Sequence, residues 1–164
     1  MDVVKATFLG FSILTLVGCL ASTDLAKSPV AEVEPAVERP VEEQLLLAAI
    51  PEPFVPKGAC GMVLWTAEGE RPSPVFRYVS EKIAEVNLNG RLVRLSRTTF
   101  NGASGFGVFE TQQFISDDGI TASVTVRFAQ GFDGGAYLER GLVTLESVEG
   151  WRSVIPAAGL AGCR

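Results

Sequence analysis

The chain has 164 residues, of which 47% are hydrophobic, and a formal net charge of −5 at neutral pH. This length allows one ordinary domain with accessory segments and excludes two full domains. The sequence contains no histidine, which removes the usual general base at neutral pH and most schemes for activating a nucleophile.

The first segment, residues 1–18, has the composition of an export signal. Lys5 precedes an apolar run from Ala6 to Val17. At about 1.5 Å per residue this run is too short to cross a ~30 Å hydrocarbon core as a helix, so the core of a signal peptide fits better than a permanent span. The run ends in Leu16-Val17-Gly18-Cys19.

These four residues resemble the lipobox of bacterial lipoprotein signals, in which a small residue precedes the cysteine that is diacylated and becomes the new amino terminus. The resemblance implies a lipid on Cys19 and a chain anchored at the cell envelope, facing the periplasm. Leu20 is not the aspartate that signals inner-membrane retention in some bacteria, which favours the outer membrane slightly. Two alternatives stay open: an uncleaved anchor helix, and cleavage after Ala21 by an ordinary signal peptidase.

The second segment, residues 19–57, is rich in Pro and Glu and predicts a semi-extended tether. Its composition cannot bury enough apolar surface to offset the entropy of ordering the chain. The apolar patch Gln44–Ile50 interrupts it. This patch is compatible with a short helix that docks on the domain, which we favour over membrane contact because it has no basic face. A turn of helix in a loose linker is the plainer expectation.

Cysteine spacing bears on the third segment, residues 58–164. With Cys19 assigned to lipid, Cys60 and Cys163 remain as a pair near the two ends of this segment. In an oxidising compartment such a pair normally forms a disulfide, with two buried free thiols as the alternative. Two thiolates without histidine are too few ligands for zinc, so we expect no metal site.

A first hairpin is predicted over residues 83–95. Asn89-Gly90 is the preferred two-residue type I′ turn, in which both residues need positive φ. This turn sets Val86 opposite Val93 on one face and Glu85 opposite Arg94 on the other. An apolar side and an ion pair result.

A second hairpin is predicted over residues 109–128, with its turn at Asp118-Gly119. The same two-residue reasoning gives an apolar face and a Glu–Arg pair on the other face. The predicted pairs are Ile115 with Ala122, Thr111 with Val126, Phe109 with Phe128, and Glu110 with Arg127.

Alternating apolar residues and frequent turn signals predict further strands. They are expected at residues 61–66, 75–80, 136–139, 142–147 and 153–155, with a bulge at Arg140-Gly141. The resulting fold class is all-β, a small antiparallel barrel or sandwich of about six to eight strands.

The search for chemistry is negative. Ser104 lies in Gly102-Ala-Ser-Gly-Phe-Gly107, but a nucleophile elbow would need glycine at Phe106, and no partner base is apparent. Gly105–Gly107 and Asp133–Gly135 are better explained as turns than as phosphate-binding loops. We therefore expect no catalytic residues and no cofactor. The third segment is close to neutral, which argues against a nucleic-acid partner.

Candidate binding residues are few. Arg91 and Arg97 either form a solvated strand end or contact an anion. The apolar side chains expected at loop tips are Phe100, Phe106, Phe132 and Trp151.

A second resemblance involves Ala103-Ser104-Gly105. A lipobox, a small disulfide-tied barrel and this loop together resemble the membrane-anchored inhibitors of C-type lysozyme, which present an Ala-Ser-Gly loop to the enzyme's cleft. The resemblance implies that Ser104 contacts the target. Val108 stands where that family has a tyrosine, and a glycine-rich spacer loop is the default reading.

Two functional hypotheses follow. In the first, the domain is a non-catalytic binding or assembly factor that holds an envelope protein or glycan through an exposed strand edge or the aromatic tips. In the second, it inhibits a lysozyme-like hydrolase through the loop at residues 101–106. Joint exposure of the aromatic tips favours the first hypothesis, whereas their burial beside a protruding Ser104 loop favours the second.

Overall fold

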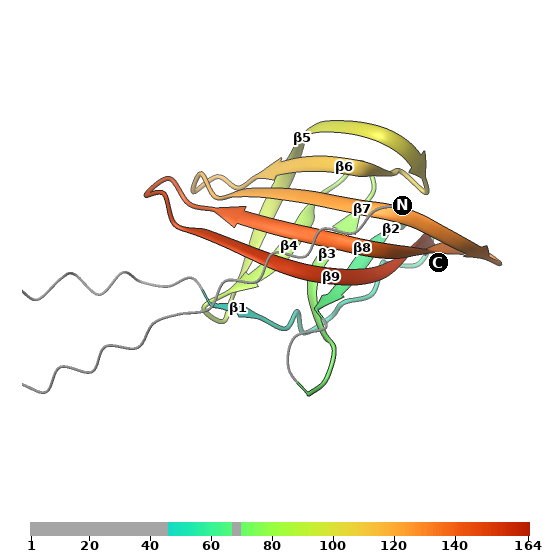
Figure 1. The fold of residues 1–164 in the computed structure, drawn as a ribbon, viewed down its shortest axis with the longest axis horizontal. Helices are drawn as coiled ribbons and strands as arrows, with labels where there is room; N and C mark the ends of the chain where they lie inside the picture. Colours follow the sequence, from blue (N-terminus) through green and yellow to red (C-terminus); the bar gives the residue numbers. More distant parts are fainter. Residues whose placement is uncertain (1–45, 67–69) are drawn as a thin grey trace, which may run out of the picture. The chain divides into compact units, whose positions relative to one another are not determined.

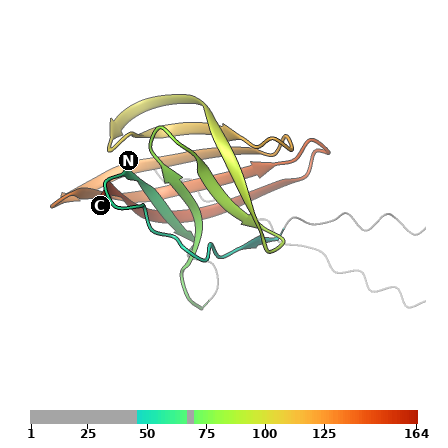
Figure 2. The ribbon, with the colours of Figure 1, turned by 180° about the vertical axis from the view of Figure 1, so that it is seen from behind.

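The computed structural model describes residues 46–66 and 70–164, so Cys19 and the signal segment lie outside the described residues. These residues form nine β-strands and no helix (Figures 1 and 2). The strands are β1 Leu47–Ala48, β2 Cys60–Thr66, β3 Ser73–Val79, β4 Ala84–Leu88, β5 Arg91–Gly105, β6 Val108–Ile115, β7 Thr121–Phe132, β8 Gly135–Glu146 and β9 Arg152–Cys163.

Strands β2 to β9 close into an eight-stranded antiparallel barrel. Each strand pairs with the next along the chain, and β9 pairs back with β2, so the topology is up-and-down. Closure leaves no free edge along the barrel wall. The predicted all-β class is confirmed, and the barrel alternative is the correct one.

The barrel interior is filled by side chains, as expected for eight strands. Its largest fully buried members include Tyr78, Phe76, Phe114 and Met62. The Phe114 ring centroid lies 5.3 Å from that of Phe76 and 5.2 Å from that of Tyr78. These rings come from β3 and β6, three strands apart around the barrel, and pack against one another across its interior.

The predicted disulfide is confirmed between Cys60 and Cys163. The two cysteines face each other across β2 and β9, the first and last strands of the barrel. Beside them, the Ser80 backbone N–H donates to the Cys60 carbonyl at 2.8 Å. The disulfide therefore links the first and last strands where the barrel closes.

Both predicted properties of the first hairpin are confirmed. Val86 opposes Val93 and Glu85 opposes Arg94, with Asn89 at φ 51°. The Glu85 and Arg94 side chains form an ion pair at 3.8 Å between Oε1 and Nε.

The predicted register of the second hairpin is wrong by one residue. Phe114, not Ile115, opposes Ala122, so Phe114 is buried and Ile115 is 42% exposed. The turn has three residues, 117–119, because the Ser116 hydroxyl accepts the Ile120 N–H at 2.9 Å and Gly119 adopts φ 81°. A type I turn followed by a left-handed glycine is the common three-residue hairpin loop.

The expected ion pair between Glu110 and Arg127 is absent from the described residues, again because of the register. Glu110 instead accepts the Ala103 backbone N–H at 3.3 Å, and Arg127 lies opposite Glu139 in the neighbouring strand.

The other predicted strands are present, although β8 joins the two expected at residues 136–139 and 142–147. The bulge at Arg140-Gly141 is confirmed by a register shift between Leu138 and Gly141, with Arg140 at φ 50°. Strand β9 extends far beyond residues 153–155, through a stretch of Pro, Ala and Gly with low strand propensity. Closure against β2 and β8 overrides that propensity. Strand β5 continues past residue 95 to Gly105.

The patch at residues 44–50 is extended where the structure describes it, not helical, and it docks on the barrel. Leu47 and Ala48 pair with the end of β4, and the Ile50 N–H donates to the Pro74 carbonyl of β3 at 2.8 Å. Strands β3 and β4 pair with each other at only two positions. The extended segment fills the gap where the two strands diverge and forms hydrogen bonds with their backbone groups there. Residues 46–57, assigned to the tether from sequence, thus lie against the barrel.

Candidate functional site

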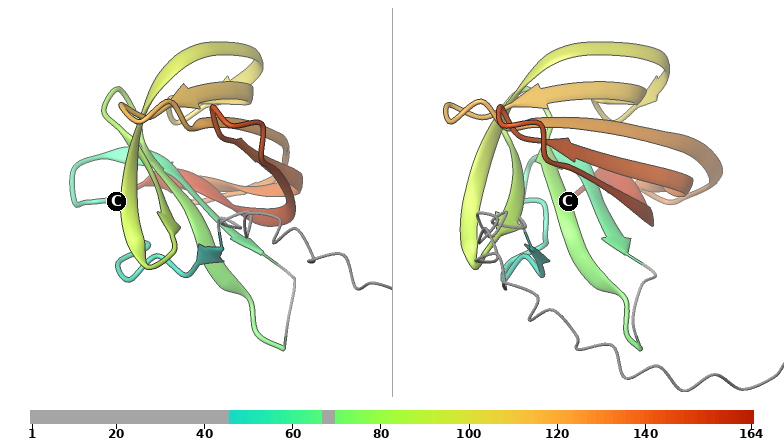
Figure 3. Two further views of the ribbon diagram at one scale, coloured as in Figure 1. Left: turned by 90° about the vertical axis from the view of Figure 1, so that its left-hand side faces the viewer. Right: turned by 60° about the vertical axis from the view of Figure 1, so that its left-hand side comes forward.

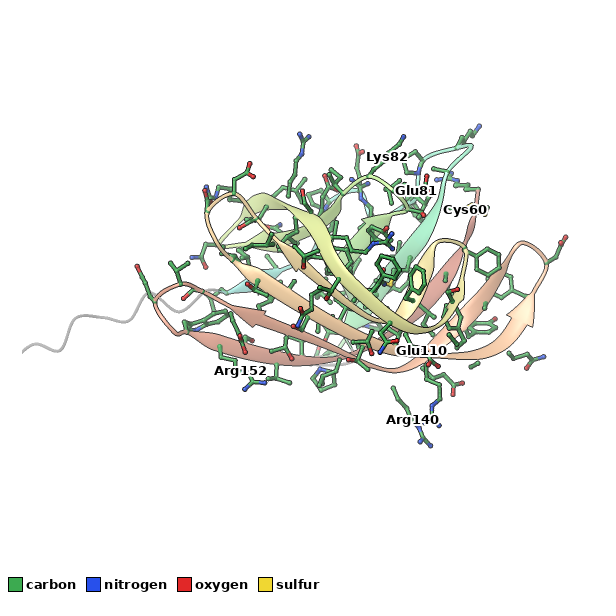
Figure 4. The ribbon with its side chains drawn as sticks, turned by 90° about the horizontal axis from the view of Figure 1, so that it is seen from above. Cys60, Glu81, Lys82, Glu110, Arg140 and Arg152 are labelled. Atoms are coloured by element: carbon green, nitrogen blue, oxygen red, sulfur yellow. A yellow bond between two sulfur atoms is a disulfide. The ribbon has the colours of Figure 1, made fainter. Side chains whose placement is uncertain are left out.

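The outer face of β9 is uncharged over most of its length. Its outward positions alternate with buried ones along the strand. After Arg152, which points away from the barrel in Figure 4, these positions are Val154, Pro156, Ala158, Leu160 and Gly162. Arg152 is ion-paired to Glu146 at 3.1 Å, which marks the polar limit of the apolar stripe.

Strand β8 widens this stripe, whereas Val63 on the β2 side is only 6% exposed. Leu160 lies between Tyr137 of β8 and Val63 of β2, and Leu142 of β8 lies opposite Pro156. Tyr137 is 50% exposed and Leu142 is 40% exposed. Exposed apolar side chains gathered on neighbouring strands in this way indicate a contact site.

A groove of about 320 Å³ lies at the end of the stripe nearest the disulfide. Three glycines stand in one row across the sheet here, since Gly61 pairs with Gly162 and Gly162 with Gly135. Because glycine has no side chain, the outer surface of the sheet is recessed along this row. The taller apolar side chains that line the groove are Phe54, Val55, Val63, Trp65, Phe132 and Leu160.

The walls of the groove are held by ring contacts. Phe132 meets Tyr137 edge-on, with 5.2 Å between ring centroids. The Arg164 guanidinium lies 5.3 Å from the Phe54 ring centroid. The charged residues that line the groove are Asp133 and Arg164, so it is suited to an apolar group flanked by polar contacts.

The predicted residues Arg97, Ser104 and Phe106 lie at or near the tip of the β5–β6 hairpin. Ser104 is exposed but belongs to β5, where it lies opposite Phe109. Phe106 forms the turn with Gly107 at φ 58° and packs partly against the core. The stretch expected to be a loop at residues 101–106 is therefore a bulged strand end with a tight turn.

Arg97 has intramolecular partners. It donates through Nη1 to the Gly107 carbonyl at 3.0 Å and to Gln112 Oε1 at 3.1 Å. Its guanidinium also lies 4.7 Å from the Phe100 ring centroid. These contacts give Arg97 a structural role in tying β5 to β6.

The other two predicted residues, Arg91 and Trp151, meet in one pocket at the opposite end of the barrel. The predicted aromatic tips are thus divided: Phe100 and Phe132 are exposed, whereas Phe106 and Trp151 are half-buried against the core.

Sequence reasoning missed the groove residues Val63, Trp65 and Leu160. One signal pointed to Leu160: residues 153–163 carry no charge at either set of alternate positions. A run that is apolar on both faces predicts a strand covered on both sides.

The chain matches no protein-family model, no curated protein and no solved structure. Within residues 46–66 and 70–164, no helix is long and apolar enough to cross a membrane. The same residues contain no group of three or more His, Cys, Asp or Glu side chains placed to hold a metal ion.

Proposed function

We propose that this protein is a lipoprotein of the bacterial cell envelope whose barrel binds an envelope protein without catalysing a reaction. The observation that carries the proposal is the uncharged outer face of β9 with the groove beside it. The groove is large enough for one or two apolar side chains of a partner. Such a side chain, buried among Trp65, Phe132 and Leu160, would act as an anchor residue of the interface.

The disulfide supports export of the chain. Bonds such as Cys60–Cys163 persist in oxidising compartments, which agrees with a signal segment ahead of the barrel. A lipid on Cys19 would hold the barrel at the periplasmic side of the membrane, with the outer membrane favoured.

The geometry supports this binding role better than inhibition of a lysozyme-like enzyme. An inhibitory loop must protrude to enter a cleft, whereas Asn101, Ser104 and Gly105 pair with β6. The exposed apolar stripe described above lies on β9, on the far side of the barrel from β5 in strand order.

Site-specific photo-crosslinking tests the proposal. A photoreactive benzoylphenylalanine replaces Leu160 in the full chain expressed in its own cell envelope. A matched control places the same group at Ser96, which is exposed on β5, four strands away around the barrel. We expect a defined crosslinked protein from position 160 and none from position 96.

Two further variants decide the outcome. Leu160→Asp is expected to abolish co-purification of the crosslinked partner, whereas Ser96→Asp retains it, because only the first buries a charge in the apolar contact. Cys19→Ala is expected to release the chain from the membrane fraction. Equal crosslinking from both positions refutes the groove as the binding surface, and membrane retention of Cys19→Ala refutes the lipid anchor.

A further inference from the structure

Two hairpin tips at one end of the barrel have the same sequence pattern and the same geometry. Residues 116–120 read Ser-Asp-Asp-Gly-Ile and residues 147–151 read Ser-Val-Glu-Gly-Trp. In both, the serine N–H donates to the carbonyl of the fifth residue at 2.9 Å. In both, the serine hydroxyl accepts the N–H of the fifth residue, at 2.9 and 3.2 Å.

The glycines complete the match. Gly119 and Gly150 have φ of 81° and 88°, and each donates its N–H to the serine carbonyl, at 3.0 and 3.1 Å. The third residue of each tip is therefore presented in the same way, and in both it is a carboxylate: Asp118 in one and Glu149 in the other.

These tips and the β4–β5 turn line a pocket of about 470 Å³. The three turns lie at the end of the barrel that faces the viewer in the left panel of Figure 3. Leu88 and Ile120, which are 3% and 7% exposed, supply buried apolar lining. Trp151 is a half-buried aromatic wall. The volume falls in the range of small-ligand sites, which occur at the mouths of β-barrels.

The rim carries both hydrogen-bond donors and acceptors. Arg91 Nη2 lies 3.0 Å from Asp118 Oδ2, and both side chains are mostly exposed. Glu149 also lines the pocket, and its carboxylate has no ion-pair partner among the described residues. The Asn89 side-chain oxygen accepts the Leu46 N–H, which leaves its amide group as a donor.

We propose that this pocket binds a short oligosaccharide. A sugar ring has an apolar face of C–H groups, which suits the Trp151 ring, and a rim of hydroxyls that donate to carboxylates and accept from Arg91 and Asn89. A purely apolar ligand would desolvate the rim charges without compensation. An anion would meet two carboxylates against one guanidinium. The proposal concerns a different surface from the groove and does not depend on it.

Tryptophan fluorescence tests the proposal on the full-length chain in detergent. The chain contains two tryptophans, Trp65 in the groove and Trp151 in the pocket, so Trp65→Phe leaves Trp151 as the reporter. The probes are chitotetraose, maltotetraose and a tetralysine peptide. We expect a saturable spectral change with at least one of the two saccharides and none with tetralysine.

Substitutions locate the binding, and isothermal titration calorimetry measures their effect because Trp151→Ala removes the fluorescent reporter. Trp151→Ala is expected to weaken saccharide binding at least about tenfold, but this residue also packs on the core. Glu149→Gln keeps the shape of an exposed side chain and is expected to weaken binding about threefold or more without changing the unfolding midpoint. Glu139→Gln, on an exposed position of β8, is the matched control and leaves binding unchanged.

Three results overturn the proposal. The first is no saturable response to either saccharide up to about 20 mM, well above the affinities of weak specific sites. The second is saccharide binding that neither Trp151→Ala nor Glu149→Gln weakens. The third is tetralysine binding that Glu149→Gln abolishes, which would assign the pocket to cationic peptides instead.

Discussion

Glu85 binds two arginines of very different burial, and removal of each is expected to have a different effect on stability. The Glu85 side chain is 5% exposed and pairs with Arg77, which is 17% exposed, and with Arg94, which is 75% exposed. Removing one partner of a buried pair costs about 3–5 kcal/mol, since the other charge is left uncompensated. An exposed pair contributes about 0–1 kcal/mol. We therefore expect Arg77→Ala to lower the free energy of unfolding several times more than Arg94→Ala.

Arg77 has a further role that raises its expected effect. Its Nη1 donates to the Glu52 carbonyl at 2.7 Å and to the Phe54 carbonyl at 3.2 Å. Arg77 thereby holds the segment that covers Glu85 and carries the Phe54 wall of the groove. Loss of this side chain releases the segment as well as the carboxylate.

Urea unfolding followed by far-ultraviolet circular dichroism measures both effects, with the slope m checked for two-state behaviour. The double variant Arg77→Met/Glu85→Met provides the control, because replacing a buried pair by apolar groups is often tolerated. We expect it to be more stable than Arg77→Met alone. Equal losses for Arg77→Ala and Arg94→Ala, or a double variant no better than the single one, would refute the reasoning.

Two further predictions concern the disulfide and two turn glycines. Cys60→Ala/Cys163→Ala opens a loop with a sequence separation of 103. The chain-entropy relation predicts that the free energy of unfolding in urea falls by about 4.7 kcal/mol. A fall below about 1 kcal/mol contradicts this prediction. Gly107→Ala is expected to destabilise the barrel more than Gly90→Ala in the same assay. Both glycines have positive φ, but an added Cβ at Gly107 would overlap the Ser80 side chain, whereas at Gly90 it meets nothing within 4 Å. Equal losses for the two glycine variants would show that backbone strain alone decides the cost.

The two hairpins show how far turn chemistry predicts register. Asn89-Gly90 specifies one loop length, because both residues adopt positive φ, and every pair along β4 and β5 follows from it. The sequence Asp117-Asp118-Gly119 is compatible with a two-residue or a three-residue loop. The Ser116 hydroxyl decides for three residues, and the choice moves Ile115 to the outside.

The strand count and the closing disulfide follow from local patterns and cysteine spacing, but the groove does not. Its floor and walls combine β2 and β9, which are about a hundred residues apart, so no local pattern contains it. Strand β9 is also hidden by its composition, since Pro156, Gly159 and Gly162 are poor strand formers. Barrel closure supplies both neighbours of this strand, and only then do its uncharged outward positions become one surface.

The pocket between the hairpin tips is a different case, because its elements are visible in the sequence. Arg91 and Trp151 are identified singly, and the shared pattern of residues 116–120 and 147–151 is present in the chain. The sequence alone does not show that the two hairpin tips lie side by side. Two tips become neighbours only if β6–β7 and β8–β9 turn at the same end, which the up-and-down order guarantees once β7 is paired with β8. In an up-and-down barrel, two turns separated by an odd number of strands lie at opposite ends. The β6–β7 and β8–β9 turns are separated by two strands, β7 and β8, and therefore lie at the same end. In this topology the two copies of the turn pattern lie at the same end of the barrel, and Asp118 and Glu149 therefore line the same pocket.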